Sequence, residues 1–299
     1  MIDEAADGAR RRHYGSFYGL TPAPESLAIV MGNCQAESLR ITLEGDDLAT
    51  VRIPAVHELT SDDLSHLERL LPRVSLLVTQ PIRDGYHDLP LGAAEMIARL
   101  PRGARHAIVP TIRHTALYPA HVIVRDHSRP LADPPIVVYH DLRELARAAG
   151  TPVRVDTEAI RAIAARSSDE LRRRESLHGA IPVSDLVDPP RFDTMRTINH
   201  PGNPVFSALA VRVRESVGLA PVAADPGRPL LDSVHAPRDP EVIETWGLDD
   251  APTDHWVVDG EVIPRDTVLS AHREWYREHP ETVSFAVRRH AETLRMMQS

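Results

Sequence analysis

Short apolar runs alternate with amphipathic stretches over residues 26–109 of the chain. The run at 26–31 is almost continuously hydrophobic, which is typical of a strand buried on both faces of a parallel sheet. Gly32 ends this run, and Leu39 and Leu43 then lie four residues apart, on one face of a predicted helix at 36–43. Three more strands are predicted, at 51–56, 74–78 and 107–109.

Helix signals separate the predicted strands. The polar cluster Thr60-Ser61-Asp62-Asp63 is typical of a helix start, because its oxygens cap backbone N–H groups and its acids suit the helix dipole. Leucines at 64, 67, 70 and 71 continue as an apolar stripe, and another helix is predicted at 93–100. Strands alternating with helices favour a parallel sheet with right-handed crossovers. We therefore expect an α/β fold in which a mostly parallel sheet is flanked by helices in three layers, of the SGNH or Rossmann-like type.

The second half of the chain is richer in helical patterns. The apolar runs at 256–258 and 261–263 flank Asp259-Gly260, a pair that favours a tight hairpin turn. We expect a loose N-terminal arm over 1–24, an α/β catalytic domain over 25–220, and a helix-rich C-terminal extension over 221–299 that packs on the core. Helices are predicted at 141–149, 157–178, 205–217, 266–277 and 281–297.

Charge and hydropathy narrow the class of function. The formal net charge of -9 disfavours non-specific nucleic-acid binding, because such binding needs a positive surface. No apolar stretch is long enough to cross a bilayer, and the polar N-terminus has no apolar signal core. We expect a cytoplasmic protein without a membrane span and without a nucleic-acid partner.

The chain contains no lysine, since all 34 basic residues are arginine. A Schiff-base lysine for pyridoxal phosphate and a Walker-type phosphate loop are therefore excluded. No glycine motif of the nicotinamide-binding kind follows a strand, and no histidine pair has a convincing metal-ligand spacing. We expect no metal, no nicotinamide and no pyridoxal phosphate.

Polar residues directly follow three of the predicted strands. In open α/β sheets, ligands bind at the carboxyl ends of the strands, where such turns meet. We therefore predict the active site at this edge of the sheet. The three turns are Gly32-Asn33-Cys34-Gln35, the segment 80–87, and Pro110-Thr111-Ile112-Arg113-His114.

Cys34 is the strongest candidate for a nucleophile. It lies at the start of a predicted helix, where the helix dipole favours the thiolate, and the amides of Asn33 and Gln35 are expected to stabilise an oxyanion. Alternatively, Cys34 only packs the turn, as cysteines outside disulfides usually do. Arg83 and Arg113 follow the third and fourth strands and are expected to bind a phosphate or carboxylate. Arg172-Arg173-Arg174 is expected to be a solvated helix face or a phosphate-binding edge.

A nucleophile needs a base, and His200 is the most distinctive of the 16 histidines. It lies in Asn199-His200-Pro201-Gly202-Asn203-Pro204, a rigid loop just before a predicted helix. Such a loop holds its side chains in place and leaves them accessible, although it can also be only a turn before the helix. The Asp-x-x-His spacing of one hydrolase class carries little weight here, because a chance match is expected. That spacing occurs at Asp63–His66, Asp84–His87 and Asp232–His235, and the weaker base candidates are His57, His87, His114, His121 and His140.

Taken in order, these segments resemble the WcbI-type family of polysaccharide biosynthesis proteins. The resemblance covers roughly 25–220 and rests on Gly32-Asn33-Cys34-Gln35, on Val78-Thr79-Gln80-Pro81-Ile82-Arg83 and on 199–203. It implies an α/β core, coenzyme A as acyl donor, and a site lined by Cys34, Gln35 and His200. The chain departs from the family at 115–121, where Tyr118-Pro119 alone keeps the order of the family's Gly-Tyr-His-Pro-like run.

The resemblance implies an acyltransferase that moves an acyl group, such as acetyl, from coenzyme A or a carrier thioester to a hydroxyl or amine of a sugar or natural-product acceptor. Partners are then a small-molecule donor and acceptor, with an acyl carrier protein as a further candidate. A thioesterase or esterase with the same Cys-His centre, or a non-catalytic coenzyme A-binding protein, is the alternative. Cys34, His200, Gln35 and Asn33 are expected to be catalytic, and Gln80, Arg83, Arg113, His114, Asn199 and Asn203 to contact the donor.

Overall fold

A computed structural model describes residues 4–126 and 131–298, with side chains described from residue 7 onward. The described chain divides into two compact units, each of which is discontinuous in sequence. Unit 1 contains the residues up to Ile112 together with Arg172–Leu186 and Asn203–Leu231. Unit 2 contains Arg113–Leu171, Val187–Gly202 and the residues from Asp232 onward. The N-terminal arm (1–24), the catalytic domain (25–220) and the C-terminal extension (221–299) that the sequence predicts stay predictions.

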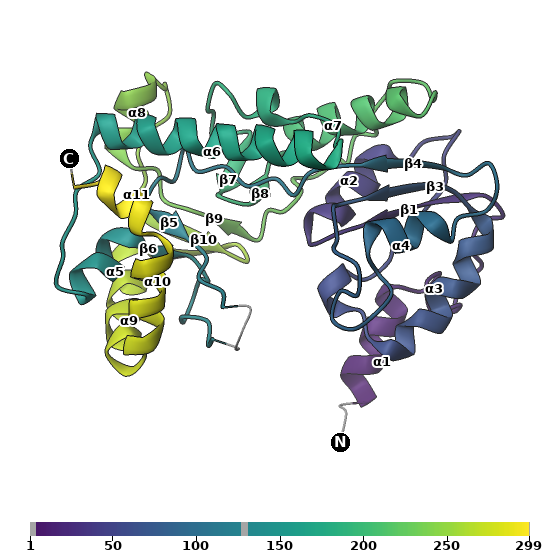
Figure 1. Cartoon of the computed structure of the whole chain (residues 1–299), viewed down its shortest axis with the longest axis horizontal. Helices are drawn as coiled ribbons and strands as arrows, with labels where there is room; N and C mark the ends of the chain where they lie inside the picture. Colours follow the sequence, from purple (N-terminus) through teal and green to yellow (C-terminus); the bar gives the residue numbers. More distant parts are fainter. Residues whose placement is uncertain (1–3, 127–130, 299) are drawn as a thin grey trace. The chain divides into compact units, whose positions relative to one another are not determined.

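The centre of unit 1 is a four-stranded sheet in the order β2-β1-β3-β4 (Figure 1). All neighbouring strands are parallel, which confirms the predicted parallel sheet. Every residue of β1 is buried, as its continuous apolar run predicts. The strands are β1 (Leu27–Met31), β2 (Thr50–Val51), β3 (Val74–Thr79) and β4 (Arg105–Ile108).

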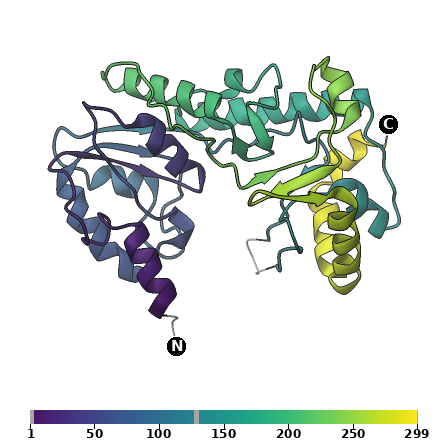
Figure 2. The ribbon, with the colours of Figure 1, turned by 180° about the vertical axis from the view of Figure 1, so that it is seen from behind.

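Helices cover both faces of this sheet. α2 (Gln35–Leu43) and α7 (Asn203–Ser216) lie on one face, and α3 (Leu64–Leu70) and α4 (Ala93–Ala98) lie on the other (Figures 1 and 2). Ile29 belongs to the hydrophobic cluster of the α3 and α4 side, whereas Val30 lines a small cavity with Leu39 and Phe206 on the α2 and α7 side. The alternation of side chains along β1 thus produces the predicted three layers.

Two local predictions for unit 1 are wrong. The strand expected at 51–56 is only the two-residue β2, and Val56–Glu58 forms a 3₁₀ turn instead. Pro54 explains this difference, because proline offers no N–H to a sheet ladder. Ahead of β1, the N-terminal segment expected to be loose contains helix α1 (Glu4–His13).

Unit 2 combines helices with three small antiparallel sheets. The predicted hairpin is present as β10 (His255–Val258) and β11 (Glu261–Pro264), and β9 (Val234–His235) pairs with β10 on the other side. Asp259 and Gly260 both have positive φ angles, 50° and 86°, as a tight hairpin turn requires. The other two sheets are β5 (His121–Val122) with β6 (His140–Asp141), and β7 (Met195–Thr197) with β8 (His200–Pro201).

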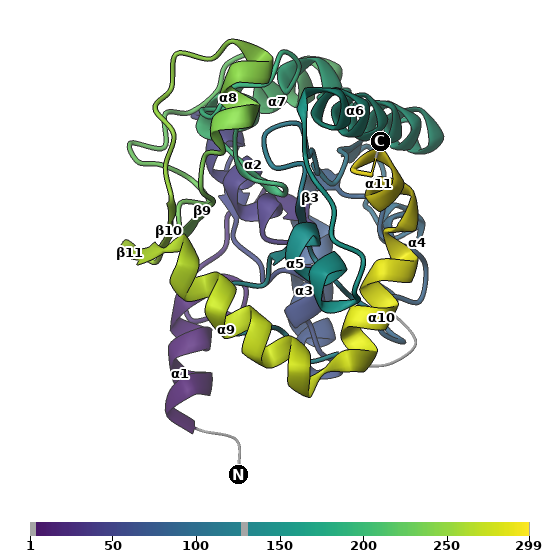
Figure 3. The ribbon, with the colours of Figure 1, turned by 90° about the vertical axis from the view of Figure 1, so that its left-hand side faces the viewer.

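The helices of unit 2 largely follow their predicted positions. The predicted helix 157–178 is α6 (Thr157–His178), of which the part up to Leu171 belongs to this unit. The prediction of a single helix at 281–297 is wrong, because the chain leaves helical geometry at His290 and forms two helices there (Figure 3). The remaining helices are α5 (Leu142–Ala148), α8 (Pro240–Trp246), α9 (Arg265–Glu278), α10 (Pro280–Arg289) and α11 (Ala291–Met296). In the described part of the chain, no helix is long and apolar enough to cross a membrane.

Candidate functional site

The turn that follows β1 is held by a network of amide side chains at the carboxyl ends of the strands. Gln80, directly after β3, accepts a hydrogen bond from the Asn33 backbone N–H through Oε1 at 2.9 Å. Its Nε2 donates to Asn33 Oδ1 and to Gln35 Oε1, both at 3.3 Å. Gln80 is buried, so these bonds form in a low-dielectric interior where each one matters more.

The same network explains why glycine stands at position 32. A Cβ atom added to Gly32 would lie 2.6 Å from Gln80 Oε1 and 2.9 Å from its Cγ. The buried Gln80 side chain therefore occupies the space that any other residue would need.

Gln35 links this turn to the segment that follows β4. Its Nε2 donates to the Ile112 carbonyl at 2.7 Å, and its Oε1 accepts from the Ile112 N–H at 2.9 Å. Its own backbone N–H donates to Asn33 Oδ1 at 3.0 Å. The two backbone amides expected to serve an oxyanion, those of Asn33 and Gln35, thus already have acceptors within the turn. Their oxyanion role stays a prediction.

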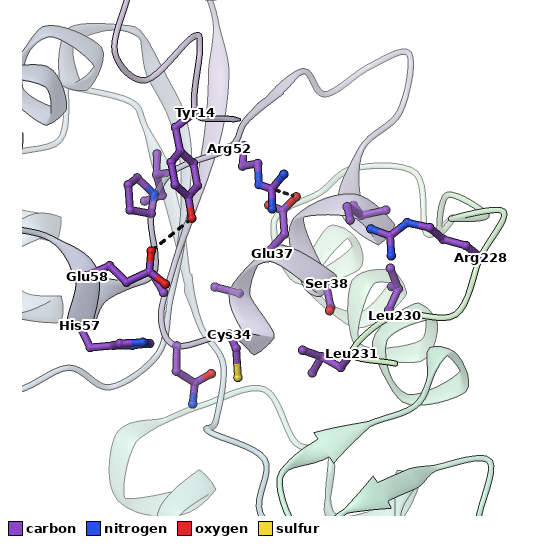
Figure 4. Close-up of a pocket in the computed structure, with 16 residues that line it drawn as sticks. Tyr14, Cys34, Glu37, Ser38, Arg52, His57, Glu58, Arg228, Leu230 and Leu231 are labelled. Atoms are coloured by element: carbon purple, nitrogen blue, oxygen red, sulfur yellow. Dashed lines mark hydrogen bonds and ion pairs between the residues drawn. The ribbon is translucent and has the colours of Figure 1, made fainter. Parts of the chain in front are cut away.

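Cys34 lies at the mouth of a cavity of about 300 Å³. Its side chain is exposed, and it precedes α2 directly. Figure 4 shows Cys34 with His57 to one side and Leu231 to the other. A volume of about 300 Å³ lies at the lower end of the range for small-molecule sites, which is enough for part of an extended ligand.

Three groups of the outer cavity wall form a connected set. The Arg52 Nε lies 3.2 Å from Glu37 Oε1, and the Arg52 guanidinium carbon lies 5.4 Å from the centre of the Tyr14 ring. The Tyr14 hydroxyl donates to Glu58 Oε2 at 3.3 Å (Figure 4). Arg52 Nε has no hydrogen-bond partner among the described residues. The guanidinium is therefore held by the charge of Glu37 and by the face of the Tyr14 ring.

Arg228 is the second cation of the cavity, and it comes from a loop far along the chain. Asn203 shapes this loop, because its Nδ2 donates to the Arg228 carbonyl at 2.9 Å and its Oδ1 accepts from the Leu230 N–H at 2.8 Å. The expected donor contact Asn203 thus supports cavity-lining residues instead of lining the cavity itself.

Helix α1 is anchored on both sides of Tyr14. Arg10 donates to the Asp63 carboxylate at 3.1 Å, and the Tyr18 hydroxyl donates to the same carboxylate at 2.8 Å. Burial raises the pKa of Tyr18, and the hydrogen bond that Tyr18 donates to Asp63 raises it further. Burial also raises the pKa of Asp63, but the hydrogen bonds that Asp63 accepts from Arg10, Thr60 and Tyr18 outweigh this effect and lower it. Asp63, taken from the sequence as a helix cap, is therefore also the anchor of the N-terminal helix.

Other expected residues of unit 1 lie away from this cavity. Arg83 is exposed and does not line the cavity. Arg174 is the member of the arginine triplet that reaches the sheet edge, where it donates to the Thr111 carbonyl at 3.1 Å. The sequence patterns did not indicate Arg52, which lies inside the strand predicted at 51–56, or Arg228, which follows no predicted strand. The donor contact expected of Arg83 stays a prediction.

In unit 2, the His200 side chain is buried. Burial lowers its pKa to about 4, and the charge of Arg196 acts in the same direction. The ring is hydrogen-bonded to the backbone of Val234, and its Nδ1 has no hydrogen-bond partner among the described residues. His200 is therefore neutral at pH 7, and its Nδ1 is a proton acceptor.

The neighbours of His200 in unit 2 are also well defined. Asn199 Oδ1 accepts hydrogen bonds from the Tyr139 hydroxyl at 2.9 Å and from Thr197 Oγ1 at 3.2 Å. His114 is buried against the Ser168 hydroxyl at 2.9 Å, and the half-buried Arg113 precedes it. The donor contacts expected of Asn199, Arg113 and His114 stay predictions.

One of the three Asp-x-x-His matches forms a hydrogen-bonded pair. His235 Nε2 lies 2.8 Å from Asp232 Oδ1, and Arg196 Nε lies 3.3 Å from the same oxygen. No group of three or more metal-ligating side chains occurs within residues 4–126 and 131–298.

Comparison with known proteins agrees with this fold. The family model described as polysaccharide biosynthesis enzyme WcbI matches residues 27–222. A solved structure of WcbI, described as a novel polysaccharide biosynthesis enzyme, is similar over 92% of this chain and 100% of its own, with a TM-score of 0.76 and 19% sequence identity. That structure is described as the native protein without a disulfide bond between coenzyme A and one of its cysteines. The search of curated proteins finds no match.

Proposed function

Because this chain belongs to the WcbI family of polysaccharide biosynthesis enzymes, we propose that it is a coenzyme A-dependent acyltransferase of that pathway class. The acyl group, with acetyl as the simplest case, passes from a coenzyme A or carrier-protein thioester to a hydroxyl or amine. The acceptor is a sugar or a related natural product. The expected compartment for this donor is the cytoplasm.

The observation that carries the proposal is the exposed thiol of Cys34 at the mouth of the 300 Å³ cavity. A thiolate attacks a thioester carbonyl readily, because sulfur is strongly nucleophilic. The similar structure is described as being without a disulfide bond between coenzyme A and one of its cysteines, so its description links coenzyme A with a cysteine of that protein. Cys34 is the one cysteine of this chain and is the proposed counterpart.

The cavity lining suits the thiol-bearing end of coenzyme A. Leu230 and Leu231 offer apolar contacts to the pantetheine arm, and Arg52 and Arg228 offer guanidinium donors to phosphate. Glu37 and Glu58 balance these two charges, so the cavity has no large positive surplus. The cavity thus fits the arm, with phosphate contacts at its two arginines.

Two routes satisfy the chemistry of the transfer. In the direct route, the acceptor oxygen bonds to the acyl carbon while the carbon–sulfur bond of coenzyme A breaks, and a base passes the acceptor proton to the departing thiolate. In the covalent route, Cys34 Sγ first displaces the coenzyme A thiol and holds the acyl group, and the acceptor then displaces Cys34. On the basis of the sequence, His200 is the proposed base in either route.

The test uses labelled acetyl-CoA and a panel of monosaccharides and amino sugars. We expect coenzyme A to be released at a rate that rises when a suitable sugar is added, and a Cys34→Ala variant to lose this release. Rapid quenching followed by peptide mapping then looks for the label on Cys34. An unlabelled Cys34 during active turnover would exclude the covalent route.

The same experiment separates the two alternatives. Release at the full rate without any acceptor identifies a thioesterase instead of a transferase. Binding of coenzyme A without release, together with an unchanged pathway product in Cys34→Ala and His200→Ala strains, identifies a non-catalytic binding protein. Either result would overturn the proposed function.

A further inference from the structure

His57 shares a cavity with Cys34, although the sequence makes it only a weaker base candidate. Both residues line the cavity of about 300 Å³, and both belong to unit 1. In Figure 4, the ring of His57 points toward the side of the cavity on which Cys34 lies. His200, the base expected from the sequence, belongs to unit 2 and does not line this cavity.

The sequence around His57 directs its side chain outward. Val56 and Leu59 are both buried in the hydrophobic cluster on the α3 and α4 side of the sheet. Because side chains three residues apart lie on one face of a 3₁₀ turn, the two residues between them face away from the cluster. His57 and Glu58 are accordingly exposed, and both line the cavity.

The turn that carries His57 is joined to the turn that carries Cys34. The Val56 N–H donates to the Gly32 carbonyl at 2.8 Å. Val56 directly precedes His57, and Gly32 lies two residues before Cys34. The imidazole and the thiol therefore extend from two backbone segments that a hydrogen bond holds together.

Glu58 fixes the other end of the His57 turn. Its carbonyl accepts a hydrogen bond from Arg10 at 3.0 Å, and its carboxylate accepts one from the Tyr14 hydroxyl at 3.3 Å. Figure 4 shows this carboxylate directed at Tyr14 and not at His57. The negative charge of Glu58 still favours a protonated imidazole nearby, which is the form that a histidine base takes after it accepts a proton.

His57 is also more accessible than His200. Its side chain is exposed, whereas the side chain of His200 is buried and its Nδ1 has no contact with solvent. A base must reach the proton that it removes, so an exposed imidazole on the cavity wall suits an entering acceptor better than a buried one.

We infer that His57 is the general base of the acyl transfer in place of His200. The inference rests on the proposed function. A ring nitrogen of His57 takes the proton from the acceptor hydroxyl or amine as the acceptor bonds to the acyl carbon. The proton then passes to the departing thiolate, which is coenzyme A in the direct route and Cys34 in the covalent route. His57 thereby returns to its neutral form.

The experiment compares His57→Ala, His57→Gln and His200→Ala in the full chain, with acetyl-CoA and the best sugar of the panel. Removing a general base costs roughly 100- to 10,000-fold in turnover, so we expect a loss of that size for both His57 variants. The KM for the acceptor should stay unchanged. Added imidazole should restore part of the turnover of His57→Ala, but not of His57→Gln, whose side chain fills the vacated space.

His178 provides a matched control. It is exposed and belongs to unit 1, where it ends α6, and it does not line the cavity. His178→Ala should keep wild-type turnover and should not respond to imidazole.

The outcomes separate the inference from the proposed function. Wild-type turnover in His57→Ala, or a loss that imidazole restores only in His200→Ala, overturns the inference while the transferase remains. Full turnover in His57→Gln, or a folded His57→Ala variant with lost turnover but no imidazole response, gives His57 a structural role and also contradicts the inference. A wild-type protein that releases no coenzyme A overturns the proposed function itself.

Discussion

At the scale of single residues, the contact between Gly32 and Gln80 determines the shape of the turn that carries Cys34. No side chain fits at position 32, because the Gln80 amide occupies the space of a Cβ. The Gln80 side-chain amide accepts a hydrogen bond from the Asn33 N–H and donates one to Gln35 Oε1, and these bonds hold the turn from the inside.

A Gly32→Ala substitution should therefore destabilise the chain. Overpacking in a tight interior costs about 1–3 kcal/mol, and the displaced Gln80 would also lose buried hydrogen bonds. Urea unfolding followed by circular dichroism measures the free energy of unfolding. Gly8→Ala is the control, because the nearest atom to its added Cβ is the end of the Arg12 side chain at 3.4 Å. Equal stability of the two variants would contradict the role given to Gln80.

The cations of the cavity make a second prediction at this scale. Arg52→Gln should raise the Kd for coenzyme A about 10- to 100-fold, since one charge-assisted hydrogen bond contributes about 1.5–3 kcal/mol. Arg83→Ala, which removes an exposed arginine that does not line the cavity, is the comparison. Calorimetric titration with coenzyme A measures both. A larger increase in Kd for Arg83→Ala than for Arg52→Gln would contradict this prediction and favour the donor contact expected of Arg83 from the sequence.

At the scale of elements, the carboxylate of Asp63 holds helix α1 against the rest of unit 1, and Tyr14, which directly follows the helix, lines the cavity. The sequence did not reveal this helix, because the first half of α1 lacks an apolar stripe and a helix of 10 residues is marginal in water by itself. Its stability depends on contacts with residues about 50 positions away, which local patterns do not show. By contrast, α6 has its own helical spacing throughout and was predicted with its observed bounds.

An Asp63→Asn substitution should release α1. Losing the charge-assisted bonds from Arg10 costs about 1.5–3 kcal/mol, which raises local opening about 10- to 100-fold. Because trypsin cleaves after arginine, the rate of cutting within Arg10-Arg11-Arg12 measures the opening. Asp62→Asn, at the exposed neighbouring position, should cleave at the wild-type rate. Slow cleavage in both variants would show that α1 is held by other contacts.

At the scale of the whole molecule, the layered core and the carboxyl-end site could be predicted, but the composition of the site could not. The apolar runs of β1 and β3 determine a parallel sheet, and such a sheet brings the turns after Met31 and Thr79 to one edge. Arg52 directly follows β2, and an irregular loop brings Arg228 to the same cavity from far along the chain. No periodic signal describes such a loop, and none links it to β2, so this pair of side chains became visible only in the folded structure.

The buried histidines predict how stability depends on pH. Burial lowers the pKa of His121 to about 4, of His140 to about 3 and of His290 to about 4, as it does for His200. All four values lie below the unfolded value of about 6.5, so the unfolded chain binds these protons first as the pH falls. The free energy of unfolding should thus be level above about pH 7 and fall between pH 6.5 and pH 4, by up to about 1.4 kcal/mol per pH unit for each histidine.

Urea unfolding at pH 7, 6, 5 and 4 checks this dependence. His121→Phe should reduce the slope, because phenylalanine keeps the ring between Tyr118 and Trp256 but cannot titrate. The carboxylates with lowered pKa values, such as Asp141, take up protons only at lower pH. Their effect on the free energy of unfolding therefore falls below the pH range in which the histidines act. A level profile from pH 7 to pH 4 would show that the histidines titrate normally.

The exposed position of Cys34 at the cavity mouth also makes the protein a ready-made sensor. Since the chain has no second cysteine and no lysine, a maleimide dye attaches at one place without any prior engineering. A dye there enters the cavity that Arg52, Glu37 and Tyr14 line, so a ligand bound in this cavity slows the attachment of the dye. Libraries of sugars and thioester analogues can then be screened by the rate of labelling, before any acceptor is known.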